Sequence, residues 1–397
     1  MLIRMTHDAD GPVLYMEGRL DTSTSEQTRT EVEKLLACED ASNGLVCNLR
    51  ELEYISSSGL RILLMMAKRC HPFRLVEVQP TVYEVLEITG FSKMMPVERA
   101  LREMNIEGCP VIGRGGVGVV YRIDDDTIVK VFREGTTLDE VCGEITMAKE
   151  AFMLGMPTAI SFDVVRVGTQ YGLVYELLRA ETLSSCLSRN PELLDSYAEK
   201  YADVFMRMHA IEVPSTSNIP SAMDHEHDAI EHIRRYFSDD DIELLLHIVD
   251  AIPPANRMLH LDLQSKNVMM QGDEPMLIDM GEIGYGHPLL DLAHAYSSMM
   301  ALVGDYETII GLPEDTAHAL WQGMLDRYFA DLTPEMRRHR EEQIMVVSKV
   351  RNFSWLSLSD SFPEAIIHQC QEIFDERVRK QKYYILKVCE TFKDWTL

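Results

Sequence analysis

Two short segments late in the chain constrain its fold most. Residues 268–270 and 276–278 are β-type runs separated by a turn-forming segment at residues 271–275, a pattern that predicts a hairpin. Asn267 precedes the first run and Asp279 follows the second. Because a hairpin brings its two open ends together, we expect these side chains to be neighbours that can hold one metal ion. Mg²⁺ favours one or two protein oxygens completed by substrate phosphates.

A further carboxylate lies just upstream of this hairpin. Asp262 is five positions before Asn267, and a carboxylate placed there can accept the proton of an attacking hydroxyl. His260 is expected to brace the loop through hydrogen bonds. The alternative is that these residues are ordinary turn and cap residues of a globular protein. The sequence upstream disfavours that alternative.

Composition narrows the choice of partners and compartment. The 397 residues contain 38 Lys and Arg but 64 Asp and Glu, a formal charge of −26. This balance argues against nucleic acid or an anionic membrane as the main partner, and it permits a cationic substrate. The eight Cys are scattered without metal-like spacing, as expected in a reducing compartment. No signal-peptide pattern or membrane-length apolar run is found, so we expect a cytoplasmic protein.

The first hundred residues alternate between the two kinds of regular structure. Strands are expected at residues 2–6, 13–17, 44–49 and 73–78, and helices at residues 24–37, from residue 60 onward with Leu60, Leu63, Leu64 and Ala67 facing the core, and at residues 81–88. Such an alternation predicts a compact α/β unit.

A serine cluster occupies a strand-to-helix junction in this unit. Residues 17–21 and 49–61, which include that cluster, resemble the STAS domain of anti-sigma-factor antagonists. The resemblance implies a protein partner and possible phosphorylation of Ser57 by a partner kinase. A phosphate there would meet free backbone N–H groups at a helix start. Ser56 stands where regulated members usually carry Asp. The alternative is that Ser56 or Ser57 only caps the helix.

A glycine-rich stretch follows a connector. Residues 95–110 suggest a short helix and then a linker, with a domain boundary near residue 105. Gly113, Gly115 and Gly118 lie between two β-rich runs, which favours a hairpin over phosphates and disfavours a strand-to-helix dinucleotide turn. Glycine lets backbone N–H groups approach phosphate oxygens closely. The alternative is a flexible hairpin without a ligand.

One lysine stands among apolar residues in the next predicted strand. Lys130 lies within residues 128–132, and a buried ammonium there needs a partner. Glu144 and Glu150, on a helix expected at residues 138–154, are the candidates. In the functional interpretation Lys130 holds the α- and β-phosphates of a nucleotide. The alternative is a surface lysine on an edge strand.

From about residue 179 the chain is expected to be mainly helical. Residues 224–228 mix His with Asp and Glu, and we expect a solvated acidic segment there, with metal binding as the alternative.

The glycine-rich stretch, the strand lysine, the segment of residues 260–267 and Asp279 occur in an order that resembles the protein-kinase-like superfamily. Only eleven residues separate Asp279 from Asp291, which leaves no room for the activation segment of a protein kinase. The chain therefore resembles the aminoglycoside phosphotransferase and choline kinase branch. Leu261 and Gln264 depart from it, since the branch often has Gly and His there.

The resemblance assigns roles to individual residues. It implies ATP and Mg²⁺ as cofactors and favours Glu144 over Glu150 as the partner of Lys130. The implied site consists of Gly113, Gly115, Gly118, Lys130 and Glu144 for the nucleotide, Glu176 and Leu178 at the adenine edge, Asn267 and Asp279 as metal ligands, Asp262 as the catalytic base, and Asp291 as a structural anchor of the catalytic loop.

The sequence thus predicts an α/β plus α+β architecture. Residues 1–104 form a STAS-like domain, residues 105–178 a β-rich lobe and residues 179–397 a helical lobe. The predicted function is transfer of the ATP γ-phosphate to a hydroxyl of a small molecule. Two alternatives are an ATP-sensing regulator in anti-sigma-type signalling and a kinase acting on the serines at residues 56–58.

Overall fold

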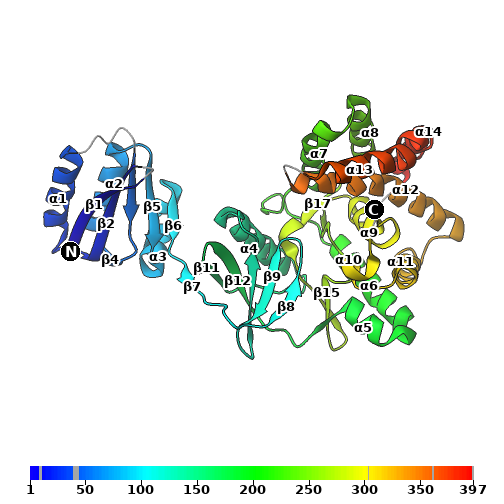
Figure 1. Ribbon diagram of the computed structural model, residues 1–397, viewed down its shortest axis with the longest axis horizontal. Helices are drawn as coiled ribbons and strands as arrows, with labels where there is room; N and C mark the ends of the chain where they lie inside the picture. Colours follow the sequence, from blue (N-terminus) through cyan, green and yellow to red (C-terminus); the bar gives the residue numbers. More distant parts are fainter. Residues whose placement is uncertain (9–10, 39–43, 303, 360–361, 396–397) are drawn as a thin grey trace. The chain divides into compact units, whose positions relative to one another are not determined.

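The chain forms two compact units (Figure 1). The computed structural model describes residues 1–8, 11–38, 44–302, 304–359 and 362–395. The first unit comprises Met1–Asn105 and Val164–Gly168, and the second comprises Ile106–Asp163 and Thr169–Leu397. Within the described residues, no helix is both long and apolar enough to cross a membrane.

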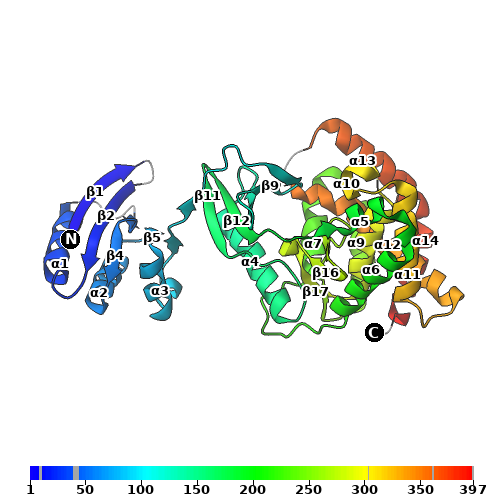
Figure 2. The same ribbon diagram turned by 90° about the horizontal axis from the view of Figure 1, so that it is seen from below.

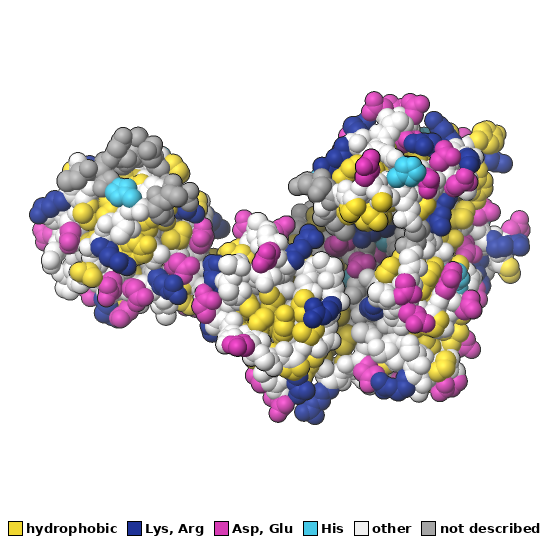
Figure 3. Space-filling view, viewed as in Figure 1, with side chains coloured by type: hydrophobic (Ala, Val, Ile, Leu, Met, Phe, Trp, Pro, Cys, Tyr) yellow, Lys and Arg dark blue, Asp and Glu magenta, His cyan; other side chains and the backbone are white. Residues whose placement is uncertain are grey.

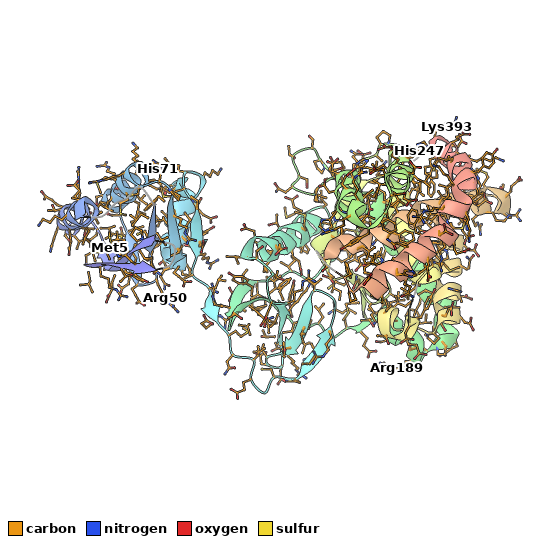
Figure 4. The ribbon with its side chains drawn as sticks, turned by 45° about the horizontal axis from the view of Figure 1, so that its top comes forward. Met5, Arg50, His71, Arg189, His247 and Lys393 are labelled. Atoms are coloured by element: carbon orange, nitrogen blue, oxygen red, sulfur yellow. The ribbon has the colours of Figure 1, made fainter. Side chains whose placement is uncertain are left out.

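The first unit is a mixed sheet with three helices. Its strands are β1 (Leu2–Asp8), β2 (Gly11–Leu20), β3 (Leu45–Asn48), β4 (Leu52–Ile55), β5 (Phe73–Val78) and β6 (Val97–Arg99), and its helices are α1 (Ser25–Cys38), α2 (Ser57–Arg69) and α3 (Pro80–Ile88). The strand order is β1-β2-β3-β5-β6, with β4 beside β2 and only β1 antiparallel to its neighbour. Arg50 follows β3 and His71 precedes β5, so the two lie at opposite ends of these parallel strands (Figure 4).

Two local predictions for this unit need correction. The core face of α2 carries Leu60 and Leu63 as expected, and the half-buried Ala67 packs against the core, but Ile62 and Met66 complete the face while Leu64 is half-buried. Residues 97–99 form β6 in place of a short helix, because Val97 pairs with Leu75 and extends the parallel sheet. A second short strand, β7 (Arg102–Glu103), pairs in parallel with β11 (Asp163–Val167).

The second unit begins with an antiparallel sheet and one helix. Strands β8 (Val111–Arg114), β9 (Gly118–Arg122), β10 (Thr127–Phe132) and β12 (Gln170–Glu176) lie in the order β12-β10-β9-β8. Helix α4 (Leu138–Met153) begins at a capping box, in which Thr137 and Glu140 satisfy each other's backbone N–H groups. Figure 2 shows α4 running beside this sheet.

The remainder of the second unit is mainly helical. It contains β13 (Glu181–Thr182), α5 (Leu183–Arg189), α6 (Leu194–His209), α7 (Ala222–Ile233), α8 (Asp239–Asp250), β14 (Arg257–Leu259), β15 (Val268–Gln271), β16 (Glu274–Leu277), β17 (Gly284–Gly286), α9 (Pro288–Met300), α10 (Tyr306–Ile310), α11 (Glu314–Tyr328), α12 (Pro334–Ser354), α13 (Glu364–Arg377) and α14 (Lys382–Cys389). Its core is built on fully buried aromatic side chains such as Tyr201, Phe205, Trp321 and Phe353. The predicted fold class is confirmed in both units.

Candidate active site

A lysine on the central part of the β-rich sheet organises the site. Lys130 lies on β10, which has β9 on one side and β12 on the other, so it is not on an edge strand. Its Nζ donates to Glu144 Oε1 and Oε2, each at 2.9 Å, and to Asp279 Oδ1 at 2.8 Å. Burial alone lowers the pKa of Lys130, but the two carboxylates outweigh it and raise that pKa above its usual value. One ammonium therefore connects the sheet, α4 and the segment that follows β16.

Glu144 and Glu150 have different partners. Glu144 is buried and also accepts a hydrogen bond from Tyr175 Oη at 3.0 Å. Glu150 instead accepts from Ser217 Oγ at 2.8 Å and from Asn218 Nδ2 at 2.9 Å. Of the two candidates, Glu144 is thus the partner of Lys130.

The predicted hairpin forms and joins its two open ends. Strands β15 and β16 pair with Val268 opposite Leu277, and the N–H of Ile278 donates to the carbonyl of Asn267 at 3.0 Å. Asp279, the next residue, has φ 60° and ψ 56°, a left-handed conformation that is uncommon for a residue other than glycine. This conformation follows from a sharp change of chain direction, and it leaves the carboxylate exposed beside Lys130.

Asp262 is tied to the same hairpin. Asn267 Nδ2 donates to the carbonyl oxygen of Asp262 at 2.8 Å and to its Oδ2 at 3.0 Å. Gln264 Nε2 lies 3.3 Å from both carboxylate oxygens. Burial and the nearby Glu282 carboxylate raise the pKa of Asp262. A carboxylate with a raised pKa is a better proton acceptor than an ordinary surface aspartate.

The backbone before Asp262 is fixed from two sides. Asp291 is fully buried and accepts from the N–H groups of His260 at 3.2 Å and Leu261 at 2.8 Å. His260 accepts the N–H of Asp262 at Nδ1, which leaves Nε2 to donate to the carbonyl of Ile278 at 3.2 Å. The predicted anchoring by Asp291 and bracing by His260 are thus present.

Sequence reasoning missed several residues that support this loop. Tyr175 contacts Glu144, and His209 Nε2 lies 3.0 Å from Asp291 Oδ2. Glu226 and His294 form a buried pair. His294 lies one helical turn after Asp291, a spacing that could have indicated it. The expectation of a solvated segment at residues 224–228 is wrong for Glu226, which α7 turns inward together with Ala222, Ala229 and Ile230.

The glycine-rich stretch is a hairpin between β8 and β9. A Cβ at Gly118 would lie 2.3 Å from the carbonyl oxygen of Val131, so only glycine fits there. A Cβ at Gly115 would meet nothing within 4 Å, and one at Gly113 would touch only Val120. The turn backbone therefore faces open space that a ligand can enter. Hydrophobic side chains gather over β8 and β9 in the space-filling view (Figure 3). Ile112 and Val117 of this hairpin are exposed.

The predicted adenine edge lies at the end of the sheet. Glu176 is the exposed last residue of β12, and Leu178 is half-buried two positions later. Between them, the N–H of Leu177 donates to the carbonyl of Asp126 at 2.7 Å. This bond fixes the course of the segment as it leaves the sheet.

The oxygen atoms available at the hairpin fit a magnesium ion. Asn267 uses its amide nitrogen on Asp262, which leaves its side-chain oxygen as a ligand, and Asp279 supplies carboxylate oxygen. Among the described residues, no three His, Cys, Asp or Glu side chains converge as a metal site. Two protein oxygens completed by phosphates match the preference of Mg²⁺.

The serine cluster of the first unit lies at the start of α2. Ser56 Oγ accepts from the N–H of Gly59 at 3.3 Å and thereby caps the helix. Ser58 Oγ lies 2.8 Å from Ser56 Oγ and 2.7 Å from Ser25 Oγ. Ser57 is exposed as the first residue of α2. Ser56 thus caps the helix, and Ser57 carries the hydroxyl that is accessible.

Comparisons with known proteins agree with both units. The model of the STAS domain matches residues 3–104, and the model of the phosphotransferase enzyme family matches residues 111–341. The chain belongs to the phosphotransferase enzyme family and carries an N-terminal STAS domain.

Two relatives match the first unit. BtrV of Bordetella bronchiseptica, which carries the designation of an anti-sigma factor antagonist, is 35% identical over 101 residues, covering 24% of this chain and 85% of that protein. The anti-sigma F factor antagonist of Paenibacillus polymyxa is 25% identical over 99 residues, covering 24% of this chain and 84% of that protein.

Among solved structures, the ADP-bound aminoglycoside phosphotransferase APH(2'')-Ib is similar to this chain, with 12% identity and a TM-score of 0.47. The similarity covers 77% of this chain and 97% of that structure's chain. A similarity this distant carries no further argument.

Proposed function

We propose that the second unit transfers the γ-phosphoryl group of ATP to a hydroxyl of a small molecule. In this proposal residues 105–178 form the nucleotide lobe and residues 179–397 the helical lobe that receives the acceptor. The backbone from Gly113 to Gly118 covers the phosphates. Lys130, oriented by Glu144, binds the α- and β-phosphates, and Glu176 and Leu178 mark the adenine edge.

The observation that carries the proposal is the convergence of charged groups around Lys130. Its ammonium contacts Glu144 from α4 and Asp279 from the catalytic segment, residues that are 14 and 149 positions away in the chain. A structural ion pair needs one carboxylate, whereas an ammonium shared between a buried and an exposed carboxylate is suited to exchange the exposed one for phosphate.

The catalytic segment then supplies the remaining parts. Asn267 and Asp279 would hold Mg²⁺, which when bound neutralises charge on the phosphates. Asp262 orients the acceptor hydroxyl and takes its proton. The short path from Asp279 to Asp291 disfavours a peptide substrate, because no docking segment fits between them. The fixed loop holds Asp262 in place, and positioning of this kind supplies much of the rate in phosphoryl transfer.

The STAS domain supports a regulatory role through a protein partner. The exposure of Ser57 at the start of α2 favours this serine as a phosphorylation site, since a phosphate there would meet the free N–H groups of the first helical turn. Phosphorylation of this serine by the chain's own second unit is a second candidate function. The cysteine usage predicts a cytoplasmic location for this proposed enzyme.

The proposal is tested by an acceptor screen that measures ADP release from MgATP. Amino sugars, choline-like alcohols and neutral sugars are the first acceptors to supply. Asp262→Asn is the inactive control, and Asp273→Asn, an exposed aspartate in the turn after β15, is the matched control. Acceptor-dependent ADP release that Asp262→Asn abolishes supports the proposal; equal release from both variants would overturn it.

Mass spectrometry of the same incubation separates the second candidate. Phosphate on Ser57 that appears only with an active second unit would assign the chain itself as the kinase of its STAS domain. An unmodified cluster at residues 56–58, together with acceptor turnover, restricts the activity to small molecules.

A further inference from the structure

A buried histidine contacts the backbone next to the proposed catalytic base. His294 on α9 has a side chain that is only 4% exposed. Its Nδ1 lies 2.5 Å from the carbonyl oxygen of Leu261, and its Nε2 lies 2.8 Å from Glu226 Oε1 on α7. Glu226 is itself buried, and its second oxygen, Oε2, has no partner among the described residues. The pair thus reaches from α7 through α9 to the catalytic loop.

The two partners of His294 fix its orientation. A carbonyl oxygen only accepts hydrogen bonds, so Nδ1 must carry a proton. Glu226 holds the opposite ring nitrogen, Nε2, at 2.8 Å. Although burial opposes ionisation, the adjacent His294 outweighs it and lowers the pKa of Glu226 to about 2. The ring is thus held from both sides, with Nδ1 as the donor to Leu261.

The carbonyl that His294 holds belongs to a residue with an unusual backbone conformation. Leu261 has φ 64°, in the left-handed region that side chains with a Cβ rarely adopt. Such a conformation persists only where surrounding contacts over-determine it. Here the N–H of Leu261 is held by Asp291 Oδ1 at 2.8 Å and its C=O by His294. The next residue is Asp262, so the orientation of its carboxylate depends on both contacts.

We propose that His294, held by Glu226, is a positioning residue that holds the left-handed turn before Asp262. This inference rests on the proposed function of Asp262. The other charged or titratable groups that act on Glu226 are Arg351 on α12 and His225 on α7, and Arg351 in turn faces Glu282 and Asp262. Neither member of the pair touches the acceptor in this scheme; both act through Leu261.

Two substitutions separate positioning from general stability. His294→Phe keeps a ring of similar size but cannot donate to Leu261. Glu226→Gln removes the charge, yet a glutamine amide can donate to Nε2 of a neutral imidazole whose Nδ1 still donates to Leu261. We expect His294→Phe to lower kcat about tenfold or more with KM for ATP within about twofold, whereas Glu226→Gln keeps kcat within about threefold.

Histidine NMR tests this hydrogen bond without any turnover. In full-length protein labelled with ¹⁵N-histidine at neutral pH, we expect Nδ1 of His294 to carry a proton in the wild type and in Glu226→Gln. His294→Gln identifies the resonances among the 13 histidines. A wild-type His294 whose Nδ1 carries no proton overturns the proposal, as does unchanged kcat in folded His294→Phe; if that variant does not fold, His294→Leu, which cannot donate either, replaces it in the same kinetic test. Because the spectrum does not depend on activity, an inactive wild type would refute the proposed function and leave the donation from His294 to Leu261 standing.

Discussion

The two units surround their proposed functional oxygens in different ways. In the first unit, the start of α2 is built from neutral hydroxyls: Ser58 is linked to both Ser25 and Ser56, and Ser57 is exposed beside them. In the second unit, the loop around Asp262 is built from charged side chains and from two residues, Leu261 and Asp279, with left-handed backbone.

The difference fits the role proposed for each oxygen. A neutral helix start can receive a negative charge, as a phosphorylation switch requires. A loop that is held in place by a buried anchor and left-handed turns suits a catalytic group that must return to one geometry in every cycle. Substitutions in the second unit should therefore have large effects, and those in the first unit small ones.

The largest expected effect is on turnover in Asp262→Asn. An amide cannot accept the hydroxyl proton, so we expect kcat to fall about 10²–10⁴-fold while KM for ATP changes little. The size of the side chain is preserved, and the melting temperature should stay close to that of the wild type. Steady-state ADP release and a thermal melt measure both. A kcat within a few-fold of the wild type would remove Asp262 from the mechanism.

Lys130→Met should have the next largest effect, on the free energy of unfolding. The substitution leaves the buried Glu144 and the nearby Asp279 without their counter-charge, and breaking a buried pair costs about 3–5 kcal/mol. Urea unfolding measures the loss. The double variant Lys130→Met, Glu144→Gln should recover part of it, because the two residues are coupled. Glu150→Gln on the same helix is the matched control and should cost under about 1 kcal/mol.

Asp291→Asn should destabilise the loop anchor in a pH-dependent way. An amide cannot accept from two backbone N–H groups and His209 as a carboxylate does, so we expect a loss of about 3 kcal/mol at pH 7. Although burial opposes it, hydrogen bonding to His209 lowers the pKa of Asp291 below 3.8 in the folded state. Its contribution is therefore present above pH 3.8 and is lost as the pH falls further. Urea unfolding at pH 7 and at pH 3 should show the difference from the wild type shrinking in acid.

Gly118→Ala and Gly115→Ala test two glycines of the hairpin between β8 and β9. Its added Cβ would lie 2.3 Å from the carbonyl oxygen of Val131, so β9 or β10 must shift, at a cost of about 1–3 kcal/mol. Gly115→Ala meets no atom within 4 Å and should cost less than about 1 kcal/mol. Unfolding of the two variants at the same denaturant concentration would contradict the close approach of Gly118 to Val131.

The smallest expected effect is in the first unit. Ser56→Ala removes the cap of α2 and should cost about 1 kcal/mol, whereas Ser57→Ala should change stability by less than about 0.5 kcal/mol. Denaturant unfolding of the two single variants measures this. A larger loss in Ser57→Ala would assign the capping role to the exposed hydroxyl and contradict the division of roles among the serines.

Much of the fold could be predicted from local patterns. The hairpin around residues 271–275 followed from turn residues between two apolar runs, and a helix was expected at residues 138–154, where α4 lies. Short edge strands such as β6 could not be predicted, because three residues carry no periodicity and Val97 becomes a strand only by pairing with Leu75. The inward face of α2 was only partly predicted, since Ile62 and Met66 fit the same helical spacing as Leu64 and Ala67.

The candidate site was predictable where order along the chain carried the information. Lys130, Asp262, Asn267 and Asp279 were identified from motifs in sequence order. The supports His260 and Asp291 were also expected, but His209, Glu226 and His294 were not, because the contacts of His209 with Asp291 and of Glu226 with His294 span 82 and 68 positions. Glu226 was placed on the surface because its neighbours are charged, whereas within residues 224–228 the helix buries Glu226 alone.

The central claim is that Lys130, Asn267 and Asp279 converge on one magnesium-bound nucleotide. Calorimetric titration of ATP, with and without Mg²⁺, into the wild type, Asp279→Asn and Asp262→Asn tests it most directly. We expect Mg²⁺ to tighten ATP binding in the wild type and in Asp262→Asn alike, and Asp279→Asn to lose that gain, at least about tenfold in Kd. Equal Mg²⁺-dependent affinity in all three folded proteins would contradict the account.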